Sequence, residues 1–374
     1  MIVPGDAEGL GQEVVNRRSP PGGGRRLARA RRLPVIRLLR YLLLRLVGVI
    51  PQVVGATVVM FLLLKLLPNP AYELLGPFAS KQDVVSAEKH LGLTKPLYDQ
   101  YFIYLGNLAQ GKLGVSWFDG ASVSHELAVR VGPTLELISL SLIIIVVVGI
   151  GAGTFIGMSR KRTSVVGRIV DLYGLLAGAF PDFWLALVLA FLFTYKLRWL
   201  PAPLGQLAPG IAVPPRITGA VGVDALLSGD WSVFGQAVAH LVLPVATLVL
   251  IYMAPIVKIT QATVREMRES EFCRHAVASG LPRGVVIRYA LRNSLAPIAT
   301  LTAVMYGYLF GGDVLVENVF SWGGVGSWAV QSVAQSDFPA IEGFLIVAVV
   351  MNVVLYLVVD VFYMLIDPRL VIAG

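Results

Sequence analysis

The feature that most constrains this chain is a series of apolar runs, each long enough to cross a lipid bilayer as a helix. A spanning helix needs about 20 mainly apolar residues. Runs of that kind occupy residues 41–67, 134–158, 169–196, 237–261, 295–319 and 343–366. Inside lipid every backbone polar group must find a partner within the protein, and helices satisfy that requirement. The sequence therefore predicts an all-α polytopic membrane protein with six transmembrane helices.

Composition and charge placement narrow the class of protein further. Hydrophobic residues make up 56% of the chain and charged residues 14%, against about 45–50% and about 25% in soluble domains. The net charge of +8 comes from basic residues in the N-terminal tail and in short stretches beside the apolar runs. A basic strip interleaved with aromatic residues, as in proteins that bind single-stranded nucleic acid, is absent from the sequence. We expect membrane lipid, and no nucleic acid, as a partner.

The distribution of Lys and Arg predicts the orientation. The connections after the second and fourth runs are rich in Arg, whereas 197–236 and 320–342 are poor in basic residues. Because cytoplasmic loops carry the excess of basic residues, both termini are expected in the cytoplasm. The predicted organisation is a disordered basic cytoplasmic tail (1–36), a first transmembrane helix (37–67), an external segment (68–133) and a core with helices two to six (134–374).

Glycines in the second run predict close helix packing. Gly149, Gly153 and Gly157 recur at four-residue spacing. Small residues at this spacing let two helix backbones approach closely in lipid, where packing drives association. We therefore expect this face of the second span to pack against another span.

The loop 264–294, between the fourth and fifth spans, predicts a helix, a corner and a second helix. Ser270 and Glu271 suit the first turn of a helix, Gly280 suits a left-handed stop, and Pro282 suits the first turn of the next helix. One small-to-apolar face is expected from residues at helical spacing, namely Phe272, Cys273, Ala276 and Ser279. A solvated loop does not need such a face, so we expect it to dock into a groove on another protein.

The same loop carries a family resemblance. The run Glu271–Leu281, followed by Arg288–Pro297, resembles the coupling-helix region of dipeptide and oligopeptide ABC transporter permeases, which has the pattern acidic-aromatic-x-Arg-x-Ala-x-Ala-x-Gly-Leu. Val277 and Ser279 depart from the Arg and Lys that are usual in the family. Further matches, from Leu91-Gly92-Leu93 to Asp367-Pro368-Arg369, extend the resemblance over nearly the whole chain from residue 37.

Membership of that family implies a permease subunit of a type I ABC importer in the bacterial cytoplasmic (inner) membrane. The implied partners are a second homologous permease, two cytoplasmic ATPases and an external substrate-binding protein. The resemblance assigns contact with an ATPase to Glu271, Phe272, Arg274, His275, Ala276, Val277, Ala278, Ser279, Gly280 and Leu281. The chain itself is expected to bind no cofactor, because the ATPase subunits use ATP and Mg.

Charged and aromatic residues inside or near the spans are candidates for the translocation pathway. Asp182, beside Trp184, either meets a peptide's amino group or accepts a hydrogen bond from backbone freed by Pro181. Asp313 and Glu317 either give the pathway an acidic lining or brace the loop that follows. Trp322 to Gly326 form either part of an external mouth or a plain glycine-rich turn.

No catalytic or metal-binding pattern is found in the sequence. Gly106 to Lys112 approaches a phosphate-binding loop, but Leu113 stands where Ser or Thr must ligate magnesium. The single cysteine and the scattered histidines lack metal-ligand spacing. The resemblance implies a permease for di- and oligopeptides, and the missing patterns predict that the chain is not itself an enzyme.

Two alternatives remain open at this point. One is the same machinery importing nickel or another small solute. The other is an ion-driven secondary transporter, whose marks would be repeated halves and paired carboxylates in mid-membrane. The sequence shows neither a clear internal repeat nor a pairing of its charged positions.

Overall fold

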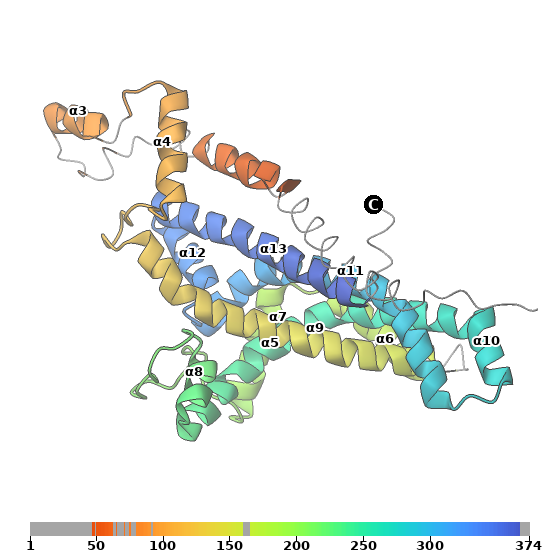
Figure 1. The fold of residues 1–374 in the computed structure, drawn as a ribbon. Helices are drawn as coiled ribbons and strands as arrows, with labels where there is room; N and C mark the ends of the chain where they lie inside the picture. The colour runs from red at the N-terminus through yellow and green to blue at the C-terminus, as the bar shows by residue number, and fades with distance from the viewer. Residues whose placement is uncertain are drawn as a thin grey trace, which may run out of the picture. The chain divides into compact units, whose positions relative to one another are not determined.

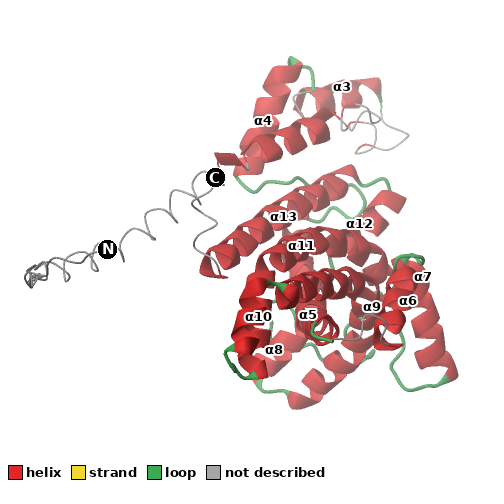
Figure 2. Ribbon diagram, turned by 90° about the vertical axis from the view of Figure 1, so that its right-hand side faces the viewer, coloured by secondary structure: helices red, strands yellow, loops and turns green. Residues whose placement is uncertain are grey.

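The computed structural model describes residues 47, 48, 50–62, 65, 71, 75, 80–90, 93–159 and 165–366. All of them belong to one compact unit, Leu46–Gly374. The predicted tail (1–36), the smaller part of the first predicted span (41–67) and the residues from 367 onward lie outside the described residues. Among the described residues there is no β-strand, and regular structure is helical apart from one isolated bridge between Val115 and Ser122 (Figure 2).

The helices follow one another along the chain with short connections in most places (Figure 1). They are α3 (Lys81–His90), α4 (Leu97–Ala109), α5 (Val123–Gly157), α6 (Val165–Ala177), α7 (Asp182–Ala190), the π-helix η1 (Phe191–Lys196), α8 (Val221–Ser228), α9 (Trp231–Glu269), α10 (Glu271–Ala278), α11 (Arg283–Phe320), α12 (Val325–Ala334) and α13 (Phe338–Ile366). Figure 1 shows α10 at one end of the long helices α9 and α11, and α12 near the other end.

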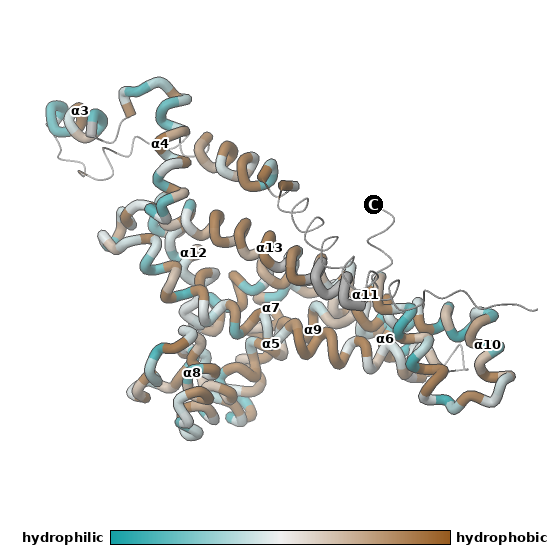
Figure 3. Tube along the Cα trace, viewed as in Figure 1, coloured by the Kyte–Doolittle hydropathy of each residue, from teal (hydrophilic) through white to brown (hydrophobic). Residues whose placement is uncertain are grey.

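Four described helices are long and apolar enough to cross a membrane: α5, α9, α11 and α13. Apolar residues dominate their middle sections, whereas α10 and several connections are more polar (Figure 3). Helices α9, α11 and α13 each contain one predicted span, and α5 contains all but the last residue of the span 134–158. Within the first predicted span, the described helix Ile50–Leu62 is apolar but shorter. The count of six transmembrane helices therefore stays a prediction.

The third predicted span, 169–196, is not one continuous helix in the structure. The chain leaves helical structure between Ala177 and Asp182, and it bends by 106° at this break. Pro181 lies at this break, and a proline removes a backbone donor and disfavours helical structure in the residue before it. If the bent pair counts as one span, the described residues hold five spans.

The predicted glycine packing is confirmed between α5 and α9. A Cβ atom on Gly153 would lie 2.5 Å from the Cβ of Thr260, and one on Gly149 would lie 2.9 Å from the Cγ2 of Ile256. Neither position has room for a larger side chain. The glycines therefore bring the two backbones into direct contact, as small residues do between helices in lipid.

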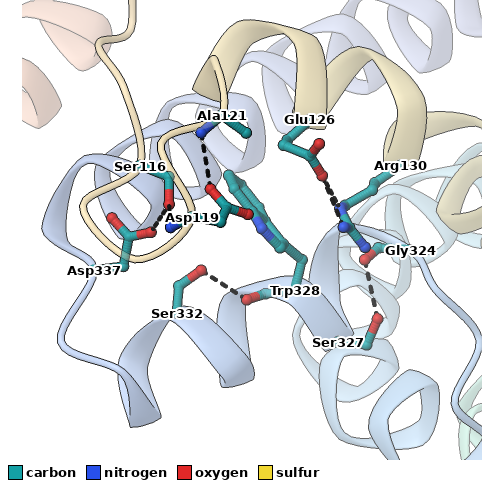
Figure 4. A network of polar contacts seen from close by, with 10 residues as sticks. All are labelled: Ser116, Asp119, Ala121, Glu126, Arg130, Gly324, Ser327, Trp328, Ser332 and Asp337. Atoms are coloured by element: carbon teal, nitrogen blue, oxygen red, sulfur yellow. Dashed lines mark hydrogen bonds and ion pairs between the residues drawn. The ribbon is translucent and has the colours of Figure 1, made fainter.

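At the end of the bundle that holds α12, a network of polar contacts joins the connections between helices (Figure 4). The carboxylate of Asp337 accepts hydrogen bonds from the hydroxyl of Ser116 and, at 3.1 Å, from the backbone N–H of Trp117. Glu126 and Arg130 form an ion pair at 2.7 Å on α5. The contacts of Asp337 tie the segment before α5 to the turn before α13.

Candidate functional sites

The predicted helix–corner–helix is present at the end of α9. Ser270 ends α9 and caps α10, and its hydroxyl accepts a hydrogen bond from the backbone N–H of Cys273 at 3.4 Å. Gly280 has φ of +75°, the left-handed conformation that ends many helices. Pro282 is the N-cap of α11, one residue before its first helical residue. The predicted helix start at Ser270 and the predicted left-handed stop at Gly280 are therefore confirmed.

The face that α10 turns toward the rest of the chain differs from the expected one. Cys273 and Ala276 are buried and form a small apolar cluster with Val264 of α9 and with Val286 and Ala290 of α11. These two small side chains let α10 fill the angle between the two long helices. Part of the predicted docking face is therefore internal packing, which the sequence cannot distinguish from a surface for a partner.

Other residues of the predicted face are exposed. The phenyl ring of Phe272 is exposed and lies 5.5 Å from the ring of Tyr289, centroid to centroid. Phe272 and Val277 are 56% and 57% exposed, and Leu281 is exposed beside them. The remaining exposed residues of this corner are Glu271, Arg274, His275, Ala278, Ser279 and Gly280. The outer surface of α10 thus combines bulky apolar side chains with charged ones.

A second candidate site lies at the break between α6 and α7. Asp182 begins α7, and its Oδ2 accepts a hydrogen bond from the hydroxyl of Tyr252 on α9 at 2.6 Å. Asp182 accepts no hydrogen bond from the backbone of any described residue, so its partner in the structure is a side chain instead. A Cβ atom on Gly312 of α11 would collide with both Asp182 and Tyr252. Three helices therefore meet closely at Asp182.

Trp184 lies on the exposed side of the same helix. Its indole ring stacks on the ring of Phe180 with centroids 4.5 Å apart, and both residues are exposed in this chain. An exposed aromatic pair on a membrane helix contacts lipid, a partner helix or the pathway.

Asp313 and Glu317, the other two pathway candidates, are buried inside the chain. They are 1% and 0% exposed and interact with each other one turn apart on α11. Their pairing is a feature that the sequence did not reveal. Glu317 accepts hydrogen bonds from the hydroxyl of Thr134 and, at 2.8 Å, from the backbone N–H of Ser327. Glu317 therefore braces the turn after α11, one of the two roles predicted for it.

The turn Trp322 to Gly326 is packed against α5. The side chain of Trp322 is buried, and its indole N–H donates a hydrogen bond to the backbone carbonyl of Pro133 at 3.1 Å. Ser321 and Gly323 both have positive φ, which reverses the chain between α11 and α12. The structure thus favours a packed turn, with Trp322 inside the protein.

Sequence reasoning missed two residues that contact these sites: Thr134 and Tyr252. Each is a polar or charged residue inside an apolar run. That property alone was a usable signal, because such residues are costly in a span and usually have a partner or a cavity. The partner of each was not readable, since it lies on another helix.

Comparison with known proteins agrees with this arrangement. Residues 138–372 match the family model "binding-protein-dependent transport system inner membrane component". Residues 38–136 match the model of the N-terminal part of such membrane components. The chain belongs to this family. It is a permease component, and its apolar helices agree with a multi-pass protein of the inner membrane.

Curated relatives cover nearly the full length of both chains. A dipeptide transport system permease protein of Alkalihalophilus pseudofirmus is 34% identical over 335 residues, 89% of this chain and 99% of the relative. A probable D,D-dipeptide transport system permease protein of Escherichia coli is 36% identical over 325 residues, 86% and 95% of the two chains. A glutathione transport system permease protein of Escherichia coli is 32% identical over 336 residues, 89% and 99%.

Proposed function

We propose that this chain forms half of the translocation pathway of an ATP-driven importer of di- and oligopeptides. The observation that carries the proposal is the family match over residues 138–372, together with relatives whose names specify dipeptides and glutathione. All these named solutes contain peptide bonds and have free termini, so a peptide is the simplest common cargo.

The proposed assembly holds a second homologous permease, two ATPase subunits, an external substrate-binding protein and surrounding lipid. Both termini and α10 lie on the cytoplasmic side in this proposal, as the basic loops predict. The chain performs no catalysis and binds no cofactor of its own. ATP and Mg are used by the ATPase subunits, and this chain converts their closure into a rearrangement of its helices.

The surface of α10 is the proposed contact with an ATPase subunit. Its exposed apolar side chains, Phe272, Val277 and Leu281, suit a helix-in-groove contact. Cys273 and Ala276 hold α10 against α9 and α11 from the inside. A force on α10 is therefore transmitted directly to two long membrane helices rather than absorbed by a loose loop.

The test is purification of the tagged chain from its native membrane, followed by reconstitution of the isolated complex. We expect two ATPases, a second permease and an exported binding protein to co-purify. Peptide uptake by the reconstituted complex is expected to require ATP and the binding protein. Ion-driven uptake by the chain alone in ATP-free liposomes would contradict the proposal. A nickel ion rather than a peptide in the binding protein would contradict the proposal that the cargo is a peptide.

A further inference from the structure

The break between α6 and α7 leaves both arms of the bent span against the same helix. α6 and α7 each pack against α9. The chain bends by 106° at the break between them. Irregular backbone at membrane depth is tolerated where it is buried in protein or lines a water-filled cavity. In many transporters, discontinuous helices of this kind form the substrate site.

One charged group stands on the α7 side of this break. Asp182 is only partly buried, and Tyr252 binds its Oδ2 atom. No described residue donates a hydrogen bond to the second carboxylate oxygen, Oδ1. One oxygen is therefore held in a fixed orientation by α9, and the other is left for a further donor.

A charge of the opposite sign stands on the α6 side. Lys258 projects from α9, and the end of its side chain lies over the backbone of Gly174 on α6, where a Cβ atom would collide with it. The neighbouring α9 residues Ile256 and Thr260 pack against glycines of α5, so Lys258 belongs to the tightly packed part of the span. Lys258 is nevertheless exposed, and within the described part of the chain it forms no ion pair.

An unpaired ammonium group in a packed membrane helix is costly and is rarely kept without a function. The spacing suggests which function. Tyr252 and Lys258 are six residues apart on α9, which corresponds to about 9 Å along the helix axis. An extended peptide of two to three residues spans about 7–10 Å. Along the α9 axis, Tyr252 and Lys258 are thus offset by about the length of a short peptide, and their side chains leave the helix about 120° apart.

We propose that Asp182 and Lys258 contact the two ends of a peptide at the break between α6 and α7. Asp182 binds the terminal ammonium group and Lys258 binds the terminal carboxylate. The inference rests on the proposed function and adds to it a requirement for a free carboxyl terminus. It also makes Lys258 a specificity-determining residue within the membrane.

Asp171 offers an alternative explanation for the charge of Lys258, and the test must distinguish this explanation from peptide binding. It is an exposed carboxylate on α6, three residues before Gly174, and no ion pair joins it to Lys258 in the structure. If Lys258 served only to balance Asp171, removing both charges together would restore function. If Lys258 binds the cargo, the double variant would stay impaired.

The experiment uses the complete complex in liposomes with ATP, the binding protein and three probes: alanyl-alanine, its C-terminal amide and its N-acetyl derivative. The same binding protein serves every variant, so its own preferences cancel in each variant-to-wild-type ratio. We expect K258Q to lower uptake of alanyl-alanine by about tenfold or more, because a hydrogen-bonded charge contact is lost. Uptake of the amide should be unchanged by K258Q. D182N should lower uptake of alanyl-alanine and leave the N-acetyl derivative unchanged.

K258R retains the positive charge and should retain the preference for a free carboxylate. ATP hydrolysis stimulated by the loaded binding protein checks that each variant complex is assembled and coupled. Equal loss of alanyl-alanine and amide uptake in K258Q, or recovery in the double variant D171N/K258Q, would overturn the inference. A wild-type complex that moves no peptide with ATP would instead overturn the proposed function.

Discussion

The carboxylate of Glu317 accepts a hydrogen bond from the backbone N–H of Ser327 at 2.8 Å, and so joins the end of α11 to the first turn of α12. Thr134 of α5 completes the junction. Its hydroxyl donates to Glu317 and accepts from the backbone N–H of Val325 at 2.9 Å. Because these groups are buried, each depends on the others for its hydrogen bonds.

Thr134→Val tests this junction. Valine keeps the shape but removes the hydroxyl, which leaves Glu317 with one donor fewer and the N–H of Val325 without its partner. An unsatisfied buried group costs about 1–3 kcal/mol, so we expect a loss of roughly 2 kcal/mol or more in the free energy of unfolding in detergent. Thr134→Ser keeps the hydroxyl and should lose much less. Equal stability of the two variants would show that the hydroxyl contributes nothing.

Gly153→Ala is expected to disrupt the contact between α5 and α9. The added methyl group would meet the Cβ of Thr260 at 2.5 Å and the carbonyl oxygen of Val257 at 2.7 Å. Backbone cannot move aside as a side chain can, so overpacking of about 1–3 kcal/mol is expected. The matched control is Gly151→Ala, which meets nothing within 4 Å. Thermal unfolding and the yield of monodisperse protein would check the difference.

Two substitutions on α10 should distinguish the role of its inner face, which packs against the chain, from that of its outer face, the proposed docking surface. Phe272→Ala removes an exposed ring, so we expect the purified chain to keep its stability while ATPase binding weakens. Ala276→Leu forces a larger side chain into the cluster with Val264 and Val286, so the chain itself should lose about 1–3 kcal/mol. Thermal unfolding of the isolated chain and stimulated ATP hydrolysis of the complex are the two readouts. Unchanged ATPase binding in Phe272→Ala would argue against the outer face as the docking surface.

Asp224 gives the connection before α9 a dependence on acid pH. Burial by itself would raise the pKa of Asp224, but hydrogen bonds from the hydroxyl and N–H of Thr218 and from the N–H of Gly219 outweigh it and lower the pKa. A lowered pKa stabilises the folded loop above the unfolded pKa of about 3.9. This stabilisation is lost as the pH falls through the lower folded value.

We therefore expect local stability around residues 218–230 to be constant near neutral pH and to fall below pH of about 4. Asp224→Asn should weaken this region at neutral pH and remove that acid dependence. Hydrogen exchange of the loop amides, extrapolated over a pH series, would measure both effects. An acid dependence that persists in the variant would assign it to another group, such as Asp119, whose pKa is lowered by hydrogen bonds from the backbone of Ala121 and from Ser116.

Local signals were sufficient where the physical cause is local. The stop at Gly280 and the cap at Ser270 depend on the conformation and side chain of a single residue, and both are found where the sequence predicts them. The packing of Gly149 and Gly153 was also predictable, because only small residues allow such approach. The sequence did not give the identity of the partner helix, since that depends on residues more than one hundred positions away.

Contacts between segments that are distant in the sequence determined the features that local signals did not predict. Cys273 looked like part of a docking face, but the angle between α9 and α11 makes it internal. The run 169–196 looked continuous by hydropathy, yet it bends by 106° at Pro181, because helix continuity depends on backbone hydrogen bonds and not on apolarity. The contacts of Tyr252 with α7 and of Lys258 with α6 depend on how these helices pack, so the sequence alone does not predict them.

The sequence by itself determined that the chain is a helical membrane protein, where several of its helices begin and end, and which family it resembles. Hydropathy, turn chemistry and the order of motifs are properties of the linear chain. Only the tertiary structure decided which carboxylates are buried together, which face of α10 is free and where a spanning segment breaks. These features arise from side chains on different helices meeting in space, and that meeting is set by the packing of the whole bundle.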